Sequence, residues 1–519
     1  MSRALPNAVV SECVDAGVDF WTAVEAVRRL GDRLRRCASP EEVRDDVFSA
    51  LCELDREAAE RYRRYHSMHV RTSKNTIEGF SREKIVASLV AETSMPREVA
   101  ENIAREAEME LRRLRLEFVS APLIREVVNV KLLEHGFEEA RARYTRLGAP
   151  VHDVGRVLER GSSACEVYRA LAGKVLREYS LLSVLPLGLA DAHMKGDIHI
   201  HALQDFPLRA WRGAGEPGGE AETPAEGVLE LMRLVREAEE RYSSRFFIEG
   251  VCAFLAPTGD AERAAELLVE HLEMCHHPLS VGISPGEGEE LAAAIAGVLA
   301  ERGSFRHRVF FSLEGSEEYL RAVHEAASAC RGVRLMRGGR FWDAPGGMLQ
   351  CVSLNLVRAA REARGDEGEF MRRVEELFEL AGEVFELKEE RVRWEGRRVY
   401  GVGIPCMQEA MSILAPEEAP KLAKRVMGVL RGLCRRSSSR EREVVLTLQG
   451  VEGAGERFRE MEGVSVPLDV ELESVVHPFC RGAIASIPLA DARPSPEALK
   501  ELSGRVLRNT KLRAWWYTW

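Results

Sequence analysis

From residue 147 onward, short apolar runs alternate with long amphipathic stretches, and this alternation constrains the fold more than any other feature. The runs are DIHIHAL, FFIEGVCAFLAP, HRVFFSLEG, QCVSLNLV, VYGVGIPC, EVVLTLQG and GAIASIPLA. Each is short and rich in the residues that favour buried strands. Between them, stretches such as GVLELMRLVREAEERYSS and EGEFMRRVEELFELAGEVFEL have the apolar spacing of helices. Strands that alternate with helices predict an α/β architecture with a large, partly parallel sheet or barrel.

The first 147 residues contain an internal repeat with an offset of about 80 residues. Residues 1–65 and about 80–147 each hold three or four segments with apolar side chains at helical spacing. Pro40 and Pro122 stand at matching helix starts, and Tyr62 and Tyr144 stand near matching helix ends. This similarity predicts a tandem duplication of one helical unit. The alternative is a plain helical bundle used for dimerisation.

The second copy is preceded by the stretch HVRTSKNTIEGFSREKI, which predicts a short hairpin that turns at Lys74. The helix that follows begins with Arg82 and Lys84, so its N-terminus offers phosphate groups a positive site. This layout resembles the ATP-cone, a regulatory domain that binds ATP or dATP on ribonucleotide reductases. The resemblance implies that Arg71, Lys74 and Lys84 contact the nucleotide. It identifies residues 66–150 as an ATP-cone and residues 1–65 as a degenerate first cone without the hairpin.

Composition narrows the functional class and the compartment. The net charge of −10 argues against general nucleic-acid binding, which needs a basic face. The N-terminus MSRALPNAVVSECV lacks a basic flank before an apolar core, and no run approaches the ~20 apolar residues of a membrane span. The 11 cysteines include no CxxC pair, so no zinc ribbon or redox motif is predicted locally. A reducing, cytoplasmic location is expected.

The stretch MKGDIHIHAL, residues 194–203, predicts a half-buried strand after a Gly-Asp turn. Asp197, His199 and His201 are expected on one face, and Ile198, Ile200 and Ala202 on the other. Titratable groups on one strand face are costly to bury unless they are hydrogen-bonded, ligated or catalytic. A structural network, residual contact with a nucleotide or polar ligand, and a metal site of the His-x-His type all remain open.

Several further stretches follow one another in a recognisable order. They are SLLSVLPLGLADAHMKGDIHIHALQDFPLRAWR, GVCAFLAPTG, MLQCVSLNLVRAAREA, YGVGIPCMQEAM, GERFREME, HPFCRGAIASIPL and NTKLRAWWYT. With the cone before it, this order resembles the anaerobic, glycyl-radical (class III) ribonucleoside-triphosphate reductases. The resemblance implies that residues 151–519 fold as a ten-stranded α/β barrel. It also implies that the barrel is lined by Asp197, His199, His201, Asn355, Arg358 and Glu409.

Radical reduction, as the resemblance implies it, needs thiols inside the barrel, a glycyl radical and a four-cysteine zinc site. Where the family has its early-strand cysteine, this chain has Arg212, and Val333 is the best match to its thiyl cysteine. Cys330 and Cys351 lie near that second place in the sequence. The chain ends at Trp515-Trp516-Tyr517-Thr518-Trp519, a predicted strand, where the family continues into its zinc cysteines and radical loop. We therefore expect no catalytic residue, no zinc and no glycyl radical on this chain.

Three functions remain open on these grounds. The first is a regulatory homologue, inactive in catalysis, that binds ATP or dATP as effector and associates with itself or with a reductase subunit. The second is an active reductase subunit completed by a separate chain that carries the zinc and glycyl-radical segment. The third is a non-enzymatic oligomerisation scaffold. No membrane or nucleic-acid partner is expected.

Overall fold

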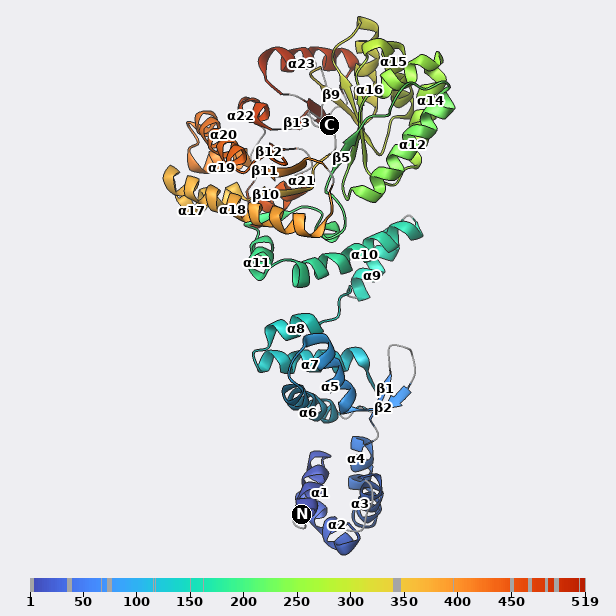
Figure 1. The fold of residues 1–519 in the computed structure, drawn as a ribbon, viewed down its shortest axis with the longest axis vertical. Helices are drawn as coiled ribbons and strands as arrows, with labels where there is room; N and C mark the ends of the chain where they lie inside the picture. The colour runs from blue at the N-terminus through green and yellow to red at the C-terminus, as the bar shows by residue number, and fades with distance from the viewer. Residues whose placement is uncertain are drawn as a thin grey trace. The chain divides into compact units, whose positions relative to one another are not determined.

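The computed structural model describes residues 4–518 except for 35–39, 67, 72–76, 115, 117, 150, 162, 339–346, 395, 449–451, 465–468, 481–483, 490–493 and 513. The chain forms two compact units, a smaller one of Met1–Gly148 and a larger one of Ala149–Trp519. Among the described residues, we find no helix long and apolar enough to cross a membrane. The two units are described separately below (Figure 1).

Four helices form the first repeat of the smaller unit, which we define as residues 4–66. They are α1 (Ala4–Asp15), α2 (Phe20–Leu30), α3 (Pro40–Leu54) and α4 (Arg56–His66). The Asp19 carboxylate accepts hydrogen bonds from the first turn of α2 and so fixes where that helix begins. The four helices share an apolar core that includes Val9, Ala26, Leu51 and Tyr62.

The second repeat, residues 68–148, combines the expected hairpin with four helices. Strands β1 (His69–Arg71) and β2 (Ile77–Gly79) pair antiparallel, which confirms the predicted hairpin arms. A third strand, β3 (Phe118–Ser120), pairs parallel with β1 and was not expected from the sequence. The helices are α5 (Arg82–Thr93), α6 (Arg97–Arg113), α7 (Ala121–Glu134) and α8 (Glu138–Tyr144). Their apolar core is separate from that of the first repeat, so each repeat has a core of its own.

The larger unit begins with three helices and contains a seven-stranded sheet. The first helices are α9 (Val151–Arg160), α10 (Ala164–Tyr179) and α11 (Leu187–Lys195). The sheet has the order β13-β14-β9-β8-β7-β6-β5, and β5 to β9 are parallel. Its strands are β5 (Gly213–Gly215), β6 (Phe246–Ile248), β7 (Leu279–Ile283), β8 (Arg308–Ser312), β9 (Val333–Met336), β13 (Ile484–Pro488) and β14 (Ala514–Thr518). The predicted C-terminal strand is therefore present as β14, with Trp515 fully buried.

Helices cover the outer side of this sheet (Figure 1). They are α12 (Pro224–Arg241), α13 (Val251–Leu255), α14 (Ala261–Met274), α15 (Glu289–Arg302), α16 (Glu317–Ala329) and α23 (Pro496–Asn509). Alternate strand residues such as Ile248, Val281 and Phe311 pack against these helices in the largest core of the molecule. Since successive strand residues point to opposite faces, the residues between them point inward.

A second, four-stranded sheet has the order β12-β11-β10-β4. Its strands are β4 (Ile198–Ile200), β10 (Gln350–Leu354), β11 (Arg398–Gly403) and β12 (Arg442–Thr447), with only β4 antiparallel to its neighbour. Its helices are α17 (Leu356–Ala363), α18 (Glu367–Arg391), α19 (Met407–Leu414), α20 (Ala419–Arg436), α21 (Glu452–Glu462) and α22 (Val470–Val476).

The two sheets enclose a common interior. Side chains from both pack together in one cluster, which we call the interior cluster: Trp211, Phe247, Phe310, Met336, Met348, Cys351, Val399 and Ala514. An antiparallel bridge between Arg212 and Met348 joins the sheets on one side. Among the described residues, no pairing joins β12 to β13 on the other side. The α/β class is as predicted, whereas a closed ten-stranded barrel is not seen in the hydrogen bonding.

Strand β4 is shorter than the sequence predicts. Ile198 and Ile200 are buried in the large core, as expected for one face. Ala202 has a φ of 49°, in the left-handed region, and packs against the interior cluster instead. The expected alternation therefore ends at Ile200, because the chain turns into the short helix Leu203–Asp205.

Candidate functional site

The second repeat contains a pocket of about 200 Å³ between the hairpin and the helices α5, α7 and α8. Its lining is Val70, Glu78, Gly79, Phe80, Ser81, Lys84, Ile85, Ser88, Ala121, Ile124, Arg125 and Tyr144. Among its apolar lining residues Ile85 and Ile124 are buried, and we call these the floor, whereas the charged side chains of Lys84 and Glu78 are exposed. A pocket with this lining suits a ligand that has a flat apolar part and an anionic part.

Each cation that lines this pocket is paired with a carboxylate. Lys84 Nζ contacts Glu78 Oε2, and Arg125 binds Glu92 through two hydrogen bonds of 2.6 and 2.9 Å. The hydrogen bond from Arg125 holds the pKa of Glu92 below its ordinary value. Arg125 also stacks on the ring of Tyr144 at 4.1 Å and donates to the Tyr144 carbonyl oxygen. An anionic ligand would have to compete with these two carboxylates for the cations.

Of the three predicted nucleotide contacts, only Lys84 can be placed in this pocket. Arg71 ends strand β1, but its side chain lies outside the described residues, as does the whole of Lys74. Sequence reasoning missed Arg125 and Tyr144. The sequence marks Tyr144 only as a repeat position, and its contact with Arg125 of α7 follows from the packing of α8 rather than from any motif.

Three histidines form a row at the inner side of β4. His193 from α11 lies 5.3 Å from His199, and His199 lies 4.7 Å from His201, measured between ring centroids. His201 bonds Ser353 Oγ at 2.8 Å, and Arg457 of α21 donates to His199 Nδ1 at 3.1 Å. We call His193, His199 and His201 the histidine row.

Burial keeps the histidine row neutral. It lowers the pKa of His193 to about 3 and that of His199 to about 4, and the Arg457 guanidinium adds to both shifts. Burial also lowers the pKa of His201 well below its usual value. Among the described residues, no group of three or more His, Cys, Asp or Glu is arranged to hold a metal ion.

Asp197, Asn355 and Arg358 meet at the end of α21. Arg358 binds Asp197 at 3.1 Å and Glu462 at 2.9 Å, and Asn355 donates to Glu462 at 3.2 Å. The Asn355 side chain also accepts from the backbone N–H of Arg358 and thereby caps α17. Each of these side chains has a protein partner, which is the arrangement of a structural network.

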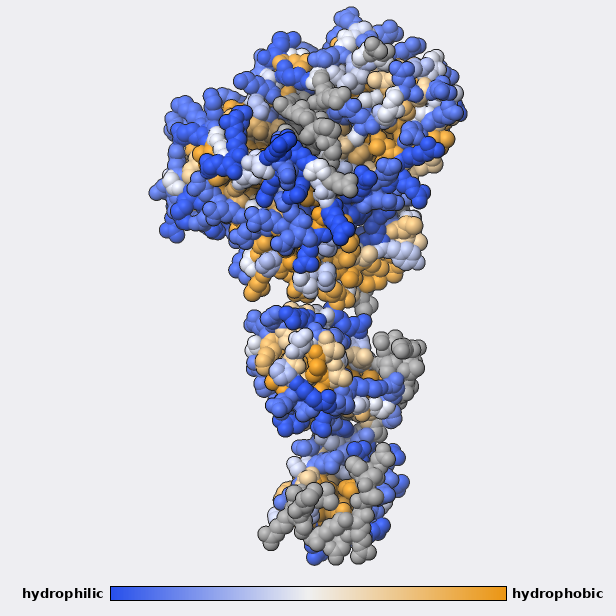
Figure 2. Space-filling view, in the orientation of Figure 1, coloured by the Kyte–Doolittle hydropathy of each residue, from blue (hydrophilic) through white to orange (hydrophobic). Residues whose placement is uncertain are grey.

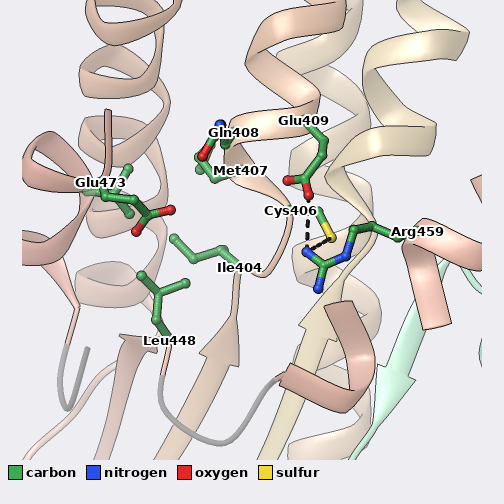
Figure 3. A pocket seen from close by; sticks show the side chains of 9 residues that line it. Ile404, Cys406, Met407, Gln408, Glu409, Leu448, Arg459 and Glu473 are labelled. Atoms are coloured by element: carbon green, nitrogen blue, oxygen red, sulfur yellow. Dashed lines mark hydrogen bonds and ion pairs between the residues drawn. The ribbon is translucent and has the colours of Figure 1, made fainter. Parts of the chain in front are cut away.

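The predicted residue Glu409 lies apart from these groups, in a separate pocket of about 180 Å³ (Figure 3). Its carboxylate binds Arg459 of α21 at 3.1 Å. The same guanidinium lies 3.9 Å from the Sγ atom of Cys406, the residue directly before α19, which has a left-handed φ of 63°. Burial, with the Glu409 charge, raises the pKa of the Cys406 thiol to about 12, so this thiol is not activated as a nucleophile.

Arg212 and Val333, which stand where the resemblance implies cysteines, have different surroundings. Arg212 is 3% exposed and stacks on Trp211 at 4.6 Å. Val333 packs in the large core outside the sheet, so a side chain at this position of β9 does not face the interior. Cys330 also belongs to that outer core, whereas Cys351 on β10 is part of the interior cluster. Burial raises the pKa of the Cys351 thiol.

Comparisons with known proteins agree with both parts of the resemblance. Residues 68–148 match the family model of the ATP cone domain. The chain shares its fold with the anaerobic ribonucleotide reductase from Thermotoga maritima with dATP bound in the specificity site, at a TM-score of 0.54 and 14% identity over 70% of this chain and 86% of that one. The same reductase with MES in the active site gives a TM-score of 0.56 and 14% identity over 76% and 90%.

A further anaerobic ribonucleotide reductase structure gives a TM-score of 0.55 and 13% identity, covering 85% of this chain and 89% of that one. No curated protein matches the sequence. The chain is therefore similar in fold to anaerobic ribonucleotide reductases and carries an ATP-cone domain.

Proposed function

We propose that this chain is an anaerobic ribonucleoside-triphosphate reductase-like protein that binds ATP or dATP in its ATP-cone and regulates deoxyribonucleotide synthesis without catalysing it. The observation that carries the nucleotide part is the cone pocket, where Lys84 and Arg125 stand beside an apolar floor. The start of α5 contributes the positive end of a helix dipole on the same side. Lys84 and Arg125 would take the phosphates, and the apolar floor would take the base.

Calorimetric titration of the full chain with ATP and dATP tests this part. We expect binding to the wild type and a loss of about tenfold in affinity for Lys84→Gln, since one charged contact to phosphate is worth about 1.4 kcal/mol. Lys131→Gln is the matched control, because Lys131 also pairs with a glutamate on a helix of this repeat but lies outside the pocket. If neither nucleotide produces heat with the wild type, the proposal fails.

The proposed lack of catalysis is supported by the packing between the sheets. Trp211, Phe247 and Phe310 pack together in the interior between the two sheets, where the resemblance implies that a ribose would meet a thiol. Arg212 is a further bulky side chain at one edge of this interior. Hydrogen-atom transfer needs an S–H group in contact with the substrate, and Cys351, the thiol of the interior cluster, is fully buried among these side chains. We expect no turnover of ribonucleoside triphosphates under anaerobic conditions.

One observation favours the alternative of an active subunit that a second chain completes. Cys351 belongs to the interior cluster. It lies on β10 two residues before Ser353, which pairs with His199 of β4. Anaerobic assays with a candidate radical-bearing partner and its activating enzyme decide between the two. Turnover that Cys351→Ala abolishes would establish the alternative and refute the inactive homologue.

Self-association is the proposed route by which the protein acts. Exposed apolar side chains follow one stripe of α10 and continue onto α11, and Figure 2 shows this end of the larger unit as largely apolar. The stripe comprises Tyr168, Val175, Tyr179, Leu182 and Leu187. Apolar surface of this kind marks interaction sites on proteins. Sedimentation with and without dATP separates regulator from scaffold, because a scaffold associates equally in both conditions.

A further inference from the structure

Arg112 is a side chain that contacts both repeats of the smaller unit. It lies near the end of α6 in the second repeat and is 15% exposed. Its guanidinium donates to the Tyr65 carbonyl oxygen of α4 and stands 4.9 Å from the centre of the Tyr65 ring. It also stands 5.7 Å from the ring of Phe80. Arg112 thus contacts one aromatic residue from each repeat.

Phe80 lies both in contact with Arg112 and in the lining of the proposed nucleotide pocket. Phe80 is part of the pocket lining, and its N–H donates to the Met68 carbonyl oxygen at 3.1 Å. Met68 lies between the end of α4 and the start of β1, so the same short segment joins the first repeat to the hairpin. A ligand that displaces the Phe80 ring must therefore change what Arg112 contacts.

Ion pairs also connect Arg112 with the first residue of α5. Glu108 accepts two hydrogen bonds from Arg112, of 3.0 and 2.8 Å, and lies 3.4 Å from Arg82. Arg82 is the first residue of α5, the helix that carries Lys84. Arg112 is thereby held between the helix start that faces the pocket and the last turn of the first repeat.

We propose that the first repeat sets the nucleotide affinity of the cone, with Arg112 as the side chain through which it acts. The inference rests on the proposed nucleotide binding and adds its regulation. Because the two repeats have separate cores, the contacts of Arg112 are a route by which packing in one repeat reaches the other. Docking of the first repeat orders Phe80 and strengthens binding, and by linkage the nucleotide stabilises the docked first repeat.

Two variants in the full chain test this role. Arg112→Gln removes the charge and the stacking, and we expect the Kd for ATP to rise about fivefold, the lower range of measured couplings between sites. Arg113→Gln is the matched control, since Arg113 is the adjacent arginine, is 66% exposed and pairs only with Glu110 among the described residues. Its Kd should stay within about twofold of the wild type. Tyr65→Leu, a change outside the pocket, should repeat the effect and serves if Arg112→Gln does not fold.

The reciprocal measurement uses Cys13, which is fully buried in the first repeat. Alkylation of Cys13 requires that repeat to open, and its rate is followed by mass spectrometry of the peptide. Saturating ATP should slow the reaction several-fold in the wild type and not in Arg112→Gln. The inference is overturned if ATP binds the wild type but leaves Cys13 equally reactive, or if neither Arg112→Gln nor Tyr65→Leu changes the Kd. Absence of ATP binding to the wild type would instead refute the proposed function, and this inference with it.

Discussion

The histidine row shows how burial decides the chemistry of a residue type that usually titrates near neutral pH. The Arg457 guanidinium donates a hydrogen bond to His199, and the rings of His193 and His201 lie 5.3 and 4.7 Å from the His199 ring. A proton on any ring would add a charge beside that guanidinium. The row is consistent with a hydrogen-bonded lining inside the unit, one of the three interpretations that the sequence left open.

A pH dependence of stability follows from these shifts. Unfolded histidine has a pKa near 6.5, whereas that of folded His199 is about 4, so the unfolded state binds more protons between these values. The contribution of neutral His199 to the free energy of unfolding is complete above about pH 6.5 and is lost as the pH falls towards 4. At pH 5 the cost for this histidine is about 2 kcal/mol.

Urea denaturation followed by tryptophan fluorescence measures this effect, since six of the seven tryptophans lie in the larger unit. Between pH 7 and pH 5, His199→Gln should lose about 2 kcal/mol less stability than the wild type. The exposed His152→Gln should follow the wild type. Equal losses for wild type and His199→Gln would show that this ring does not control acid stability.

The strand face on which an individual residue lies was predictable where a local pattern determines it. Alternation placed His199 and His201 away from Ile198 and Ile200, and that separation is observed. The position of Val333 was not predictable in the same way, because a comparison based on a short match does not say which face of β9 a residue occupies.

At the scale of secondary structure, helix α21 contacts most of the polar residues that were predicted to line the barrel. Arg457 reaches the histidine row, Arg459 binds Glu409, and Glu462 binds Arg358 and Arg361. One short helix therefore connects every predicted barrel-lining group except His201 and Asp197, and it reaches Asp197 through Arg358. The sequence marked this helix only as part of an ordered set of motifs.

We expect that neutralising the charge of Glu462 destabilises helix α21. Glu462 is 9% exposed, and Glu462→Gln breaks two ion pairs that are partly shielded from water, at a cost of about 1–3 kcal/mol. Hydrogen exchange over residues 452–462 should become about tenfold faster or more, as expected for local opening eased by that amount. Glu460→Gln on the exposed side of the same helix is the control. Unchanged exchange in Glu462→Gln would mean that the other contacts of α21, such as the packing of Phe458 and the ion pair of Arg459, are sufficient to hold the helix.

Elements with strong periodicity or a clear turn were predictable, and very short ones were not. The hairpin arms on either side of Lys74 are present, as is the C-terminal strand. Strand β3 has only three residues, Phe118–Ser120, and shows no alternation that would distinguish it from a loop. Its pairing with β1 comes from the packing of the second repeat, which a single sequence does not reveal.

At the scale of the whole molecule, separate cores predict separate unfolding. The two cores of the smaller unit share no residue with the cores of the larger unit. A ligand stabilises only the cooperative unit whose folded state it binds, by about 2.7 kcal/mol at 100 times its Kd. Scanning calorimetry should therefore show at least two transitions, with ATP raising the one that belongs to residues 1–148.

The assignment of that transition can be checked without removing any part of the chain. In Lys84→Gln the ATP-induced shift should shrink in proportion to the lost affinity, whereas Glu462→Gln should lower the other transition and leave the shift intact. An ATP shift of both transitions by similar amounts would contradict independent units and would require energetic coupling between them.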